Sequence, residues 1–136
     1  MSGWIHHIDI TVSDLTASTR YYDLVLPRMG FRRIADVAEG PLWAGARVEL
    51  GLQSARPERA RSHDRYTPGL HHLAFGAADR AAVDRLYQAL LELRIDVLDP
   101  PAPYDRYTVG YYAVFFVDPD GIKLEYVHTP KWPGEP

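Results

Sequence analysis

The sequence predicts an α+β fold in which two βαβββ modules follow one another in tandem and form a curved sheet around a cleft. Two observations support this prediction: an internal repeat and the order of the elements within each half. Seven residues of the first half recur 65 positions further along, in one register without gaps: His6, His7, Asp14, Ala17, Arg20, Tyr22 and Leu26 return as His71, His72, Asp79, Ala82, Arg85, Tyr87 and Leu91. So many identities at one offset indicate a duplicated structural unit.

The first module is expected at about residues 4–53. Apolar and polar residues alternate over 4–12, which is typical of a strand. Ser13 and Asp14 then supply N-cap oxygens for one helix, which continues to Met29 and ends at Gly30, the usual residue at a helix C-terminus. Short strands are expected at 31–37, 42–46 and 47–53, where glycines and Pro41 separate them.

The second module is expected at about residues 70–128, after a polar linker at 54–69. A strand at 70–76 leads to a helix that begins at the N-cap Asp79 and ends near Arg94. A further strand begins at 95–98, and the segment 100–108, rich in proline and tyrosine, is expected to be a structured loop. Strands at 109–117 and 122–128 flank an Asp-Pro-Asp-Gly turn. Residues 1–136 are therefore predicted to form a single domain.

The composition excludes several classes of protein. Of the 136 residues, 46% are hydrophobic and 24% are charged, and the net charge is −3, which is ordinary for a globular protein. The sequence has no run of basic residues of the kind that binds nucleic acid, and no segment is apolar enough to cross a bilayer. The chain has no cysteine, so only nitrogen and oxygen ligands remain for a metal. We expect a cytoplasmic protein with no nucleic-acid or membrane partner.

The paired histidines indicate a metal site. Side chains alternate along a strand, so one histidine of each pair points into the cleft. His7 shares its face with Asp9 and Thr11, whereas Ile8 and its apolar neighbours form the other face, which favours His7 and its repeat His72 as the inward pair. A single strand histidine more often makes a structural hydrogen bond, but repetition in register favours a ligand role.

Two strand glutamates are expected to complete this site. Glu125 lies between Leu124 and Tyr126 in mid-strand, where an unpaired carboxylate would be costly to bury. Glu49 occupies the corresponding strand of the first module, although Gln53 on the same face is an alternative counterpart. Together with His7 and His72 these residues would bind one divalent ion and leave positions for water or substrate. The site would use one or both glutamates, and Glu49 is also the candidate general base.

The tyrosine-rich segment is the remaining candidate for function. Glu125 follows Glu49 by 76 residues, against 65 for the histidines, so the second module holds about 11 additional residues, most simply near 100–110. Loops added at a cleft often carry specificity, although plain strand packing explains these tyrosines equally well. We expect the substrate to contact five residues: Asp9, Gln53, Tyr104, Arg106 and Tyr107.

Three motifs resemble the vicinal oxygen chelate superfamily, which includes glyoxalases, bleomycin resistance proteins and extradiol dioxygenases. They are His-His-Ile-Asp-Ile-Thr-Val-Ser-Asp-Leu at 6–15, Gly-Leu-His-His-Leu-Ala-Phe at 69–75 and Phe-Val-Asp-Pro-Asp-Gly-Ile-Lys-Leu-Glu-Tyr at 116–126. The resemblance is to the glyoxalase-like branch. It implies paired βαβββ modules, a homodimer, and a divalent metal held by His7, His72 and Glu125, with Glu49 as a fourth ligand.

The resemblance leaves two functions open. The first is a metalloenzyme that acts on a small molecule with adjacent oxygens, as a lyase or isomerase with nickel, zinc or manganese, or as a dioxygenase with iron. The alternative is a metal-free protein that binds a drug or another small molecule, as bleomycin resistance proteins do. Thr11 and Gln53 stand where glutathione-dependent glyoxalases have arginine and asparagine, so dependence on glutathione is not expected. The linker allows the modules to pair within one chain or between two.

Overall fold

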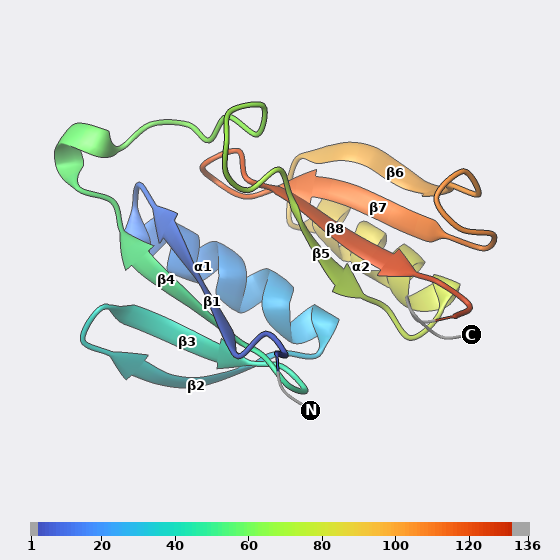
Figure 1. The fold of residues 1–136 in the computed structure, drawn as a ribbon, viewed down its shortest axis with the longest axis horizontal. Helices are drawn as coiled ribbons and strands as arrows, with labels where there is room; N and C mark the ends of the chain where they lie inside the picture. Colours follow the sequence, from blue (N-terminus) through green and yellow to red (C-terminus); the bar gives the residue numbers. More distant parts are fainter. Residues whose placement is uncertain (1–2, 132–136) are drawn as a thin grey trace. The chain divides into compact units, whose positions relative to one another are not determined.

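The computed structural model describes residues 3–131, and its elements follow the duplicated βαβββ order (Figure 1). Two short 3-10 helices, Leu26–Met29 and Pro57–Arg59, accompany the main elements, which are β1 (His7–Val12), α1 (Leu15–Val25), β2 (Arg32–Val37), β3 (Gly40–Ala44), β4 (Glu49–Ser54), β5 (Leu73–Gly76), α2 (Arg80–Glu92), β6 (Val97–Pro103), β7 (Tyr112–Val117) and β8 (Lys123–His128). Among these described residues, no helix is both long and apolar enough to cross a membrane.

The chain divides into two compact units, which we call module 1 (up to Ser62) and module 2 (from His63). Each module forms its own four-stranded mixed sheet, with strand order β1-β4-β3-β2 in module 1 and β5-β8-β7-β6 in module 2. In both sheets the first strand runs parallel to the fourth and the other pairs are antiparallel. The two modules therefore share one topology, as the repeat predicts.

The helix of each module covers one face of its sheet (Figure 1). In module 1 the apolar face predicted for β1 is confirmed, since Ile10 and Val12 are buried while His7, Asp9 and Thr11 are exposed. Burial of such side chains against a helix contributes most of the stability of a small module. The core of module 1 consists of Ile10, Val12, Tyr21, Tyr22, Val25, Leu26, Met29, Trp43, Leu50 and Leu52.

The helix N-caps repeat as predicted. Asp14 Oδ1 accepts a hydrogen bond of 3.0 Å from Ala17 N, and Asp79 Oδ1 accepts one of 2.7 Å from Ala82 N. A side-chain oxygen at this position satisfies an amide that has no partner within the helix. The predicted turn before β8 is also confirmed, because Asp118 Oδ1 accepts from the amides of Asp120 and Ile122 at 2.9 and 2.8 Å.

Several predicted boundaries were wrong. The first helix changes to a 3-10 turn at Leu26, because Pro27 cannot donate to the α-helical ladder. The first strand of each module begins later than predicted, at His7 and at Leu73, so that His72 directly precedes β5. Within the predicted linker, His63 N donates a 2.8 Å hydrogen bond to Asp120 O of module 2.

The proline-rich segment was predicted as a loop, yet β6 continues through Pro100 to Pro103. This strand lies at the edge of its sheet and its pairing with β7 is irregular near Asp99 and Ala102. An edge strand bonds to a neighbour on one side only, so prolines are tolerated where their missing N–H would face away. The loop is confined to residues 104–111, and the equivalent connection in module 1 is residues 38–39.

Candidate functional site

In module 2, β5 and β8 bring a histidine and a glutamate together. His72 Nε2 lies 3.0 Å from Glu125 Oε1. Glu125 sits in mid-strand on β8, where it pairs with Ala74 of β5 and Phe115 of β7. We call His72, Glu125 and the tyrosine described next the module 2 half-site.

The carboxylate of Glu125 is buried, with 1% of the residue exposed. Its second oxygen, Oε2, accepts a short hydrogen bond from the hydroxyl of Tyr111. A buried carboxylate needs such partners, because removal from water is otherwise very unfavourable. Burial, followed by the hydrogen bond to Glu125 and its charge, raises the pKa of Tyr111, so the phenol keeps its proton at neutral pH.

The pair of donor atoms fits a divalent metal ion. Neighbouring ligands in octahedral coordination, each about 2.1 Å from one ion, are about 3.0 Å apart, whereas tetrahedral ligands are about 3.4 Å apart. His72 Nε2 and Glu125 Oε1 have the octahedral separation. Imidazole nitrogen and carboxylate oxygen are also ligands that zinc, nickel, manganese and iron accept. His72 Nδ1 lies 2.8 Å from His71 Nδ1, so a neighbouring ring steadies the imidazole.

Module 1 carries its own candidate residues around a pocket of about 270 Å³. His7 on β1 and Glu49 on β4 are direct partners in the parallel pairing. Asp9 and Gln53 lie on the same face, and Gln53 Nε2 donates a 3.1 Å hydrogen bond to Asp9 Oδ2. Among residues 3–131 no hydrogen bond joins His7 to Glu49, and no three His, Asp or Glu side chains converge as a metal-binding group.

The strand pairing differs between the two modules and corrects one predicted equivalence. Asp9 and Ala74 correspond in the repeat, but Asp9 pairs with Gly51 whereas Ala74 pairs with Glu125. By register, the counterpart of Glu125 is therefore Gly51 and neither Glu49 nor Gln53. A Cβ at Gly51 would lie 2.5 Å from Asp9 Oδ1, so the Asp9 carboxylate fills the space that a side chain at position 51 would need.

The predicted loop residues gather in module 2 as an aromatic and cationic cluster. Tyr104 and Tyr107 stack with their ring centroids 5.8 Å apart. The guanidinium of Arg106 lies 5.3 and 4.8 Å from the two ring centroids, within cation–π range. Tyr104 contacts Phe115 edge-on at 5.5 Å, and Phe115 contacts His72 at 6.3 Å, so the cluster is continuous with the module 2 half-site.

Sequence reasoning missed Tyr111 of this half-site and Phe115, whose ring contacts His72. The strand predicted at 109–117 held a signal for both, because residues 111 and 115 are an even number of positions apart and would share one face, although in the structure Tyr111 is the last loop residue before β7. Phe115 pairs directly with Glu125. Knowledge of that pairing would have placed Tyr111 on the side of the carboxylate.

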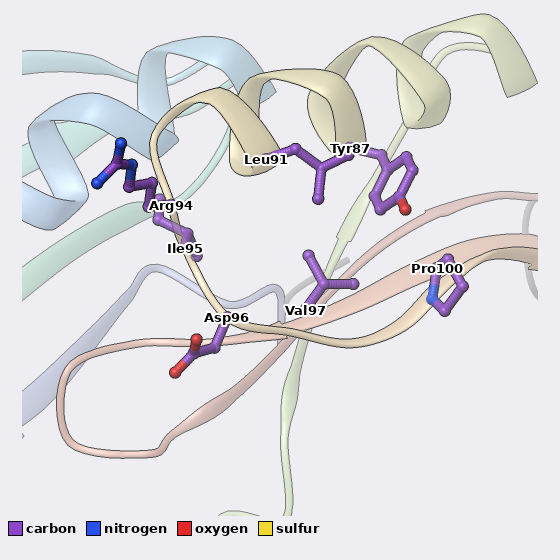
Figure 2. Close-up of a pocket in the computed structure, with 7 residues that line it drawn as sticks. All are labelled: Tyr87, Leu91, Arg94, Ile95, Asp96, Val97 and Pro100. Carbon is purple, nitrogen blue, oxygen red and sulfur yellow. The ribbon is translucent and has the colours of Figure 1, made fainter.

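A separate pocket of about 490 Å³ lies between the end of α2 and the start of β6, as Figure 2 shows. None of the predicted site residues lines it. Its lining residues are Tyr87, Leu91, Arg94, Ile95, Asp96, Val97 and Pro100. The candidate chemistry therefore belongs to the histidine-bearing strands and not to this pocket.

Comparisons with known proteins agree with this architecture. Residues 4–126 match the family model of the Glyoxalase/Bleomycin resistance protein/Dioxygenase superfamily. The uncharacterized protein YqjT of Bacillus subtilis (strain 168) is 36% identical over 128 residues, which cover 90% of this chain and 97% of that protein. A candidate glyoxalase from Bacillus halodurans is 30% identical, with a TM-score of 0.79 over 93% of this chain and 96% of that chain.

A lactoylglutathione lyase from Agrobacterium tumefaciens is similar in fold, with a TM-score of 0.72 and 22% identity over 97% of this chain and 98% of that chain. At this identity the likeness concerns the fold alone. The matches confirm the predicted α+β architecture of two tandem βαβββ modules.

Proposed function

The chain belongs to the glyoxalase/bleomycin resistance protein/dioxygenase superfamily, and from this premise we propose that it is a metalloenzyme acting on a small molecule with two adjacent oxygens. The observation that supports the proposal is the position of His72 Nε2, which lies 3.0 Å from Oε1 of Glu125, a buried carboxylate. Fold membership alone would not support a reaction, because members of one fold differ widely in activity.

In this proposal the ligands are His7, His72 and Glu125, with Glu49 as a fourth. The half-site of module 2 supplies His72 and Glu125 already paired, which favours binding since little rearrangement is needed. His7 and Glu49 are neighbours in the strand register of module 1 and contribute the remaining donors. The nitrogen and oxygen donor set suits nickel, zinc, manganese or iron.

A bound divalent ion would supply Lewis acidity toward the adjacent oxygens of the substrate. Side chains of the protein would carry out the proton transfer. Glu49 is half-buried and makes no hydrogen bond with His7, so its carboxylate is available to accept a proton from a carbon beside a substrate carbonyl. That role corresponds to a lyase or isomerase. If Glu49 is not a ligand, the remaining triad of His7, His72 and Glu125 would leave positions open and would suit iron and dioxygen chemistry.

The remaining predicted residues are proposed to contact the substrate. Asp9 and Gln53 line the pocket of module 1, and Tyr104, Arg106 and Tyr107 form the cluster beside Phe115. Gln53 is engaged with Asp9, and neither Thr11 nor Gln53 supplies the arginine and asparagine expected for glutathione, so the proposed substrate carries no glutathione. We also propose that the protein acts as a homodimer.

The first test is the metal content of the protein purified without chelator, measured by inductively coupled plasma mass spectrometry beside the His72→Ala variant. We expect about one divalent ion per chain in the wild type and loss of most of it in the variant. Nickel, zinc or manganese would favour the lyase or isomerase reaction, and iron the dioxygenase reaction. Absence of metal in the wild type after reconstitution with all four ions would overturn the proposal and make the protein a small-molecule binder.

A further inference from the structure

The two oxygens of the Glu125 carboxylate have different partners. Oε1 faces His72 Nε2 at 3.0 Å, and Oε2 accepts the hydrogen bond from Tyr111. With the residue almost wholly buried, these contacts decide how the carboxylate is oriented. The tyrosine thus occupies one oxygen and leaves the other for a ligand role.

The loop before β7 holds Tyr111 through its backbone. Tyr111 N donates to Thr108 O at 3.0 Å, and Tyr111 O accepts from Tyr104 N at 2.8 Å. The preceding residue, Gly110, donates from its amide to Asp105 Oδ1 at 3.0 Å. Both main-chain polar groups of Tyr111 are therefore hydrogen-bonded, in addition to the contacts that its side chain makes.

Ring contacts hold the side chain of Tyr111 as well. Its ring lies edge-on to Tyr107 at 5.2 Å and to Tyr104 at 6.3 Å. Edge-to-face contacts of this kind fix a ring orientation and contribute about 1 kcal/mol each. The hydroxyl is consequently presented to Glu125 by a side chain with little remaining freedom.

We propose that Tyr111 is a positioning residue that holds Glu125 as a one-oxygen ligand, with Oε1 presented to the metal and Oε2 kept by the phenol. The inference rests on the proposed function, in which Glu125 binds a divalent ion. Partners that orient a ligating carboxylate typically change metal affinity by about 10- to 100-fold when removed. Without the phenol, Oε2 is free to rotate or to bind the ion as a second oxygen.

Cobalt(II) is the probe for this role, because its visible absorption reports the number and type of ligands and its binding can be followed by calorimetry. Full-length wild type, Tyr111→Phe and Tyr112→Phe are compared after removal of metal with a chelator. Tyr112→Phe is the matched control, since the Tyr112 hydroxyl also donates to a carboxylate, Asp84 Oδ1 at 2.6 Å, which is outside the half-site. Circular dichroism verifies that each variant is folded.

We expect Tyr111→Phe to weaken cobalt binding by about 10-fold or more and to change the absorption spectrum of the complex. Tyr112→Phe should bind within about 2-fold of the wild type with an unchanged spectrum, because it touches no proposed ligand. Wild-type affinity and spectrum in Tyr111→Phe would overturn the role of Tyr111 alone. A wild type that binds no cobalt would instead overturn the proposed function, and this inference with it.

A second measurement examines the carboxylates of the wild type and uses one variant, Glu125→Gln, only to assign the band. Infrared difference spectra, recorded with and without cobalt, separate carboxylates that bind an ion through one oxygen from those that bind through two. We expect the one-oxygen pattern for the carboxylate band that disappears in Glu125→Gln. A two-oxygen pattern for that band would contradict the proposed constraint by Tyr111.

Discussion

The two modules arose from one repeat, yet they hold their carboxylates differently. In module 2 the carboxylate comes from the fourth strand, as Glu125, and both of its oxygens are engaged in a buried setting. In module 1 the corresponding position is Gly51, and a carboxylate reaches the same space from the neighbouring strand, as Asp9. The two modules therefore share one arrangement of strands, while individual residues on those strands determine how each carboxylate is held.

This difference predicts that the glutamates contribute unequally to metal affinity. Glu125→Gln should weaken cobalt binding by about 100-fold or more, because it removes a charged ligand that is already oriented. Glu49→Gln should weaken binding by about 10-fold or less, since Glu49 is only half-buried and has no hydrogen bond to His7. Calorimetric titration of the metal-free variants measures both values. An equal loss in the two variants would show that the half-sites contribute alike.

The close approach of Asp9 to Gly51 predicts a steric coupling within module 1. Gly51→Ala places a methyl group 2.5 Å from Asp9 Oδ1 and 2.9 Å from Leu42 Cδ2, which forces both side chains to move. We expect a loss of about 2 kcal/mol in the free energy of unfolding, measured by urea denaturation. We expect the same displacement to weaken the hydrogen bond from Gln53 to Asp9.

The matched control for this coupling is Gly51→Ala in an Asp9→Ala background. With the carboxylate removed, the loss should fall below about 1 kcal/mol, because Ala is less unfavourable than Gly in a strand interior and lowers the entropy of the unfolded chain. The same loss in both backgrounds would mean that Leu42 or the backbone, and not Asp9, limits the space at position 51.

The features that were predictable from the sequence are those that depend on neighbours along the chain. Alternation identified the exposed face of His7, Asp9 and Thr11, and the repeated aspartates identified both helix starts. The extent of β6 was not predictable in this way, because prolines lower the expectation of a strand unless the strand is known to lie at an edge.

The organisation of the half-sites depends instead on contacts between distant residues. Tyr111 was missed because it lies in the loop before β7, and its contact with Glu125 of β8 joins residues that are 14 positions apart in the chain. The equivalence of Glu49 and Glu125 was wrong for the same reason, since a shift of two residues in register leaves the alternation of each strand unchanged. The proposed ligand roles of His7, His72, Glu125 and Glu49 stay predictions until metal binding is measured.

The smallest predicted effects concern the ends of the two helical segments, where the modules again use different residues. Gly30 and Arg94 both adopt a left-handed backbone, with φ of 88° and 57°. A residue with a side chain is strained there by about 1 kcal/mol, whereas glycine is not. A Cβ at Gly30 would meet no atom within 4 Å, so any cost of Gly30→Ala is conformational.

We therefore expect Gly30→Ala to lower the free energy of unfolding by about 1 kcal/mol and Arg94→Gly to raise it by about 0.5 kcal/mol, the gain being reduced by the greater entropy of glycine in the unfolded chain. Urea denaturation of both variants measures the values. Arg94→Ala is the control, because it keeps the strained backbone and removes only the guanidinium; it should change stability by less than about 0.5 kcal/mol. A loss of stability in both Arg94 variants would mean that the side chain at the pocket of Figure 2 contributes more than the backbone strain costs.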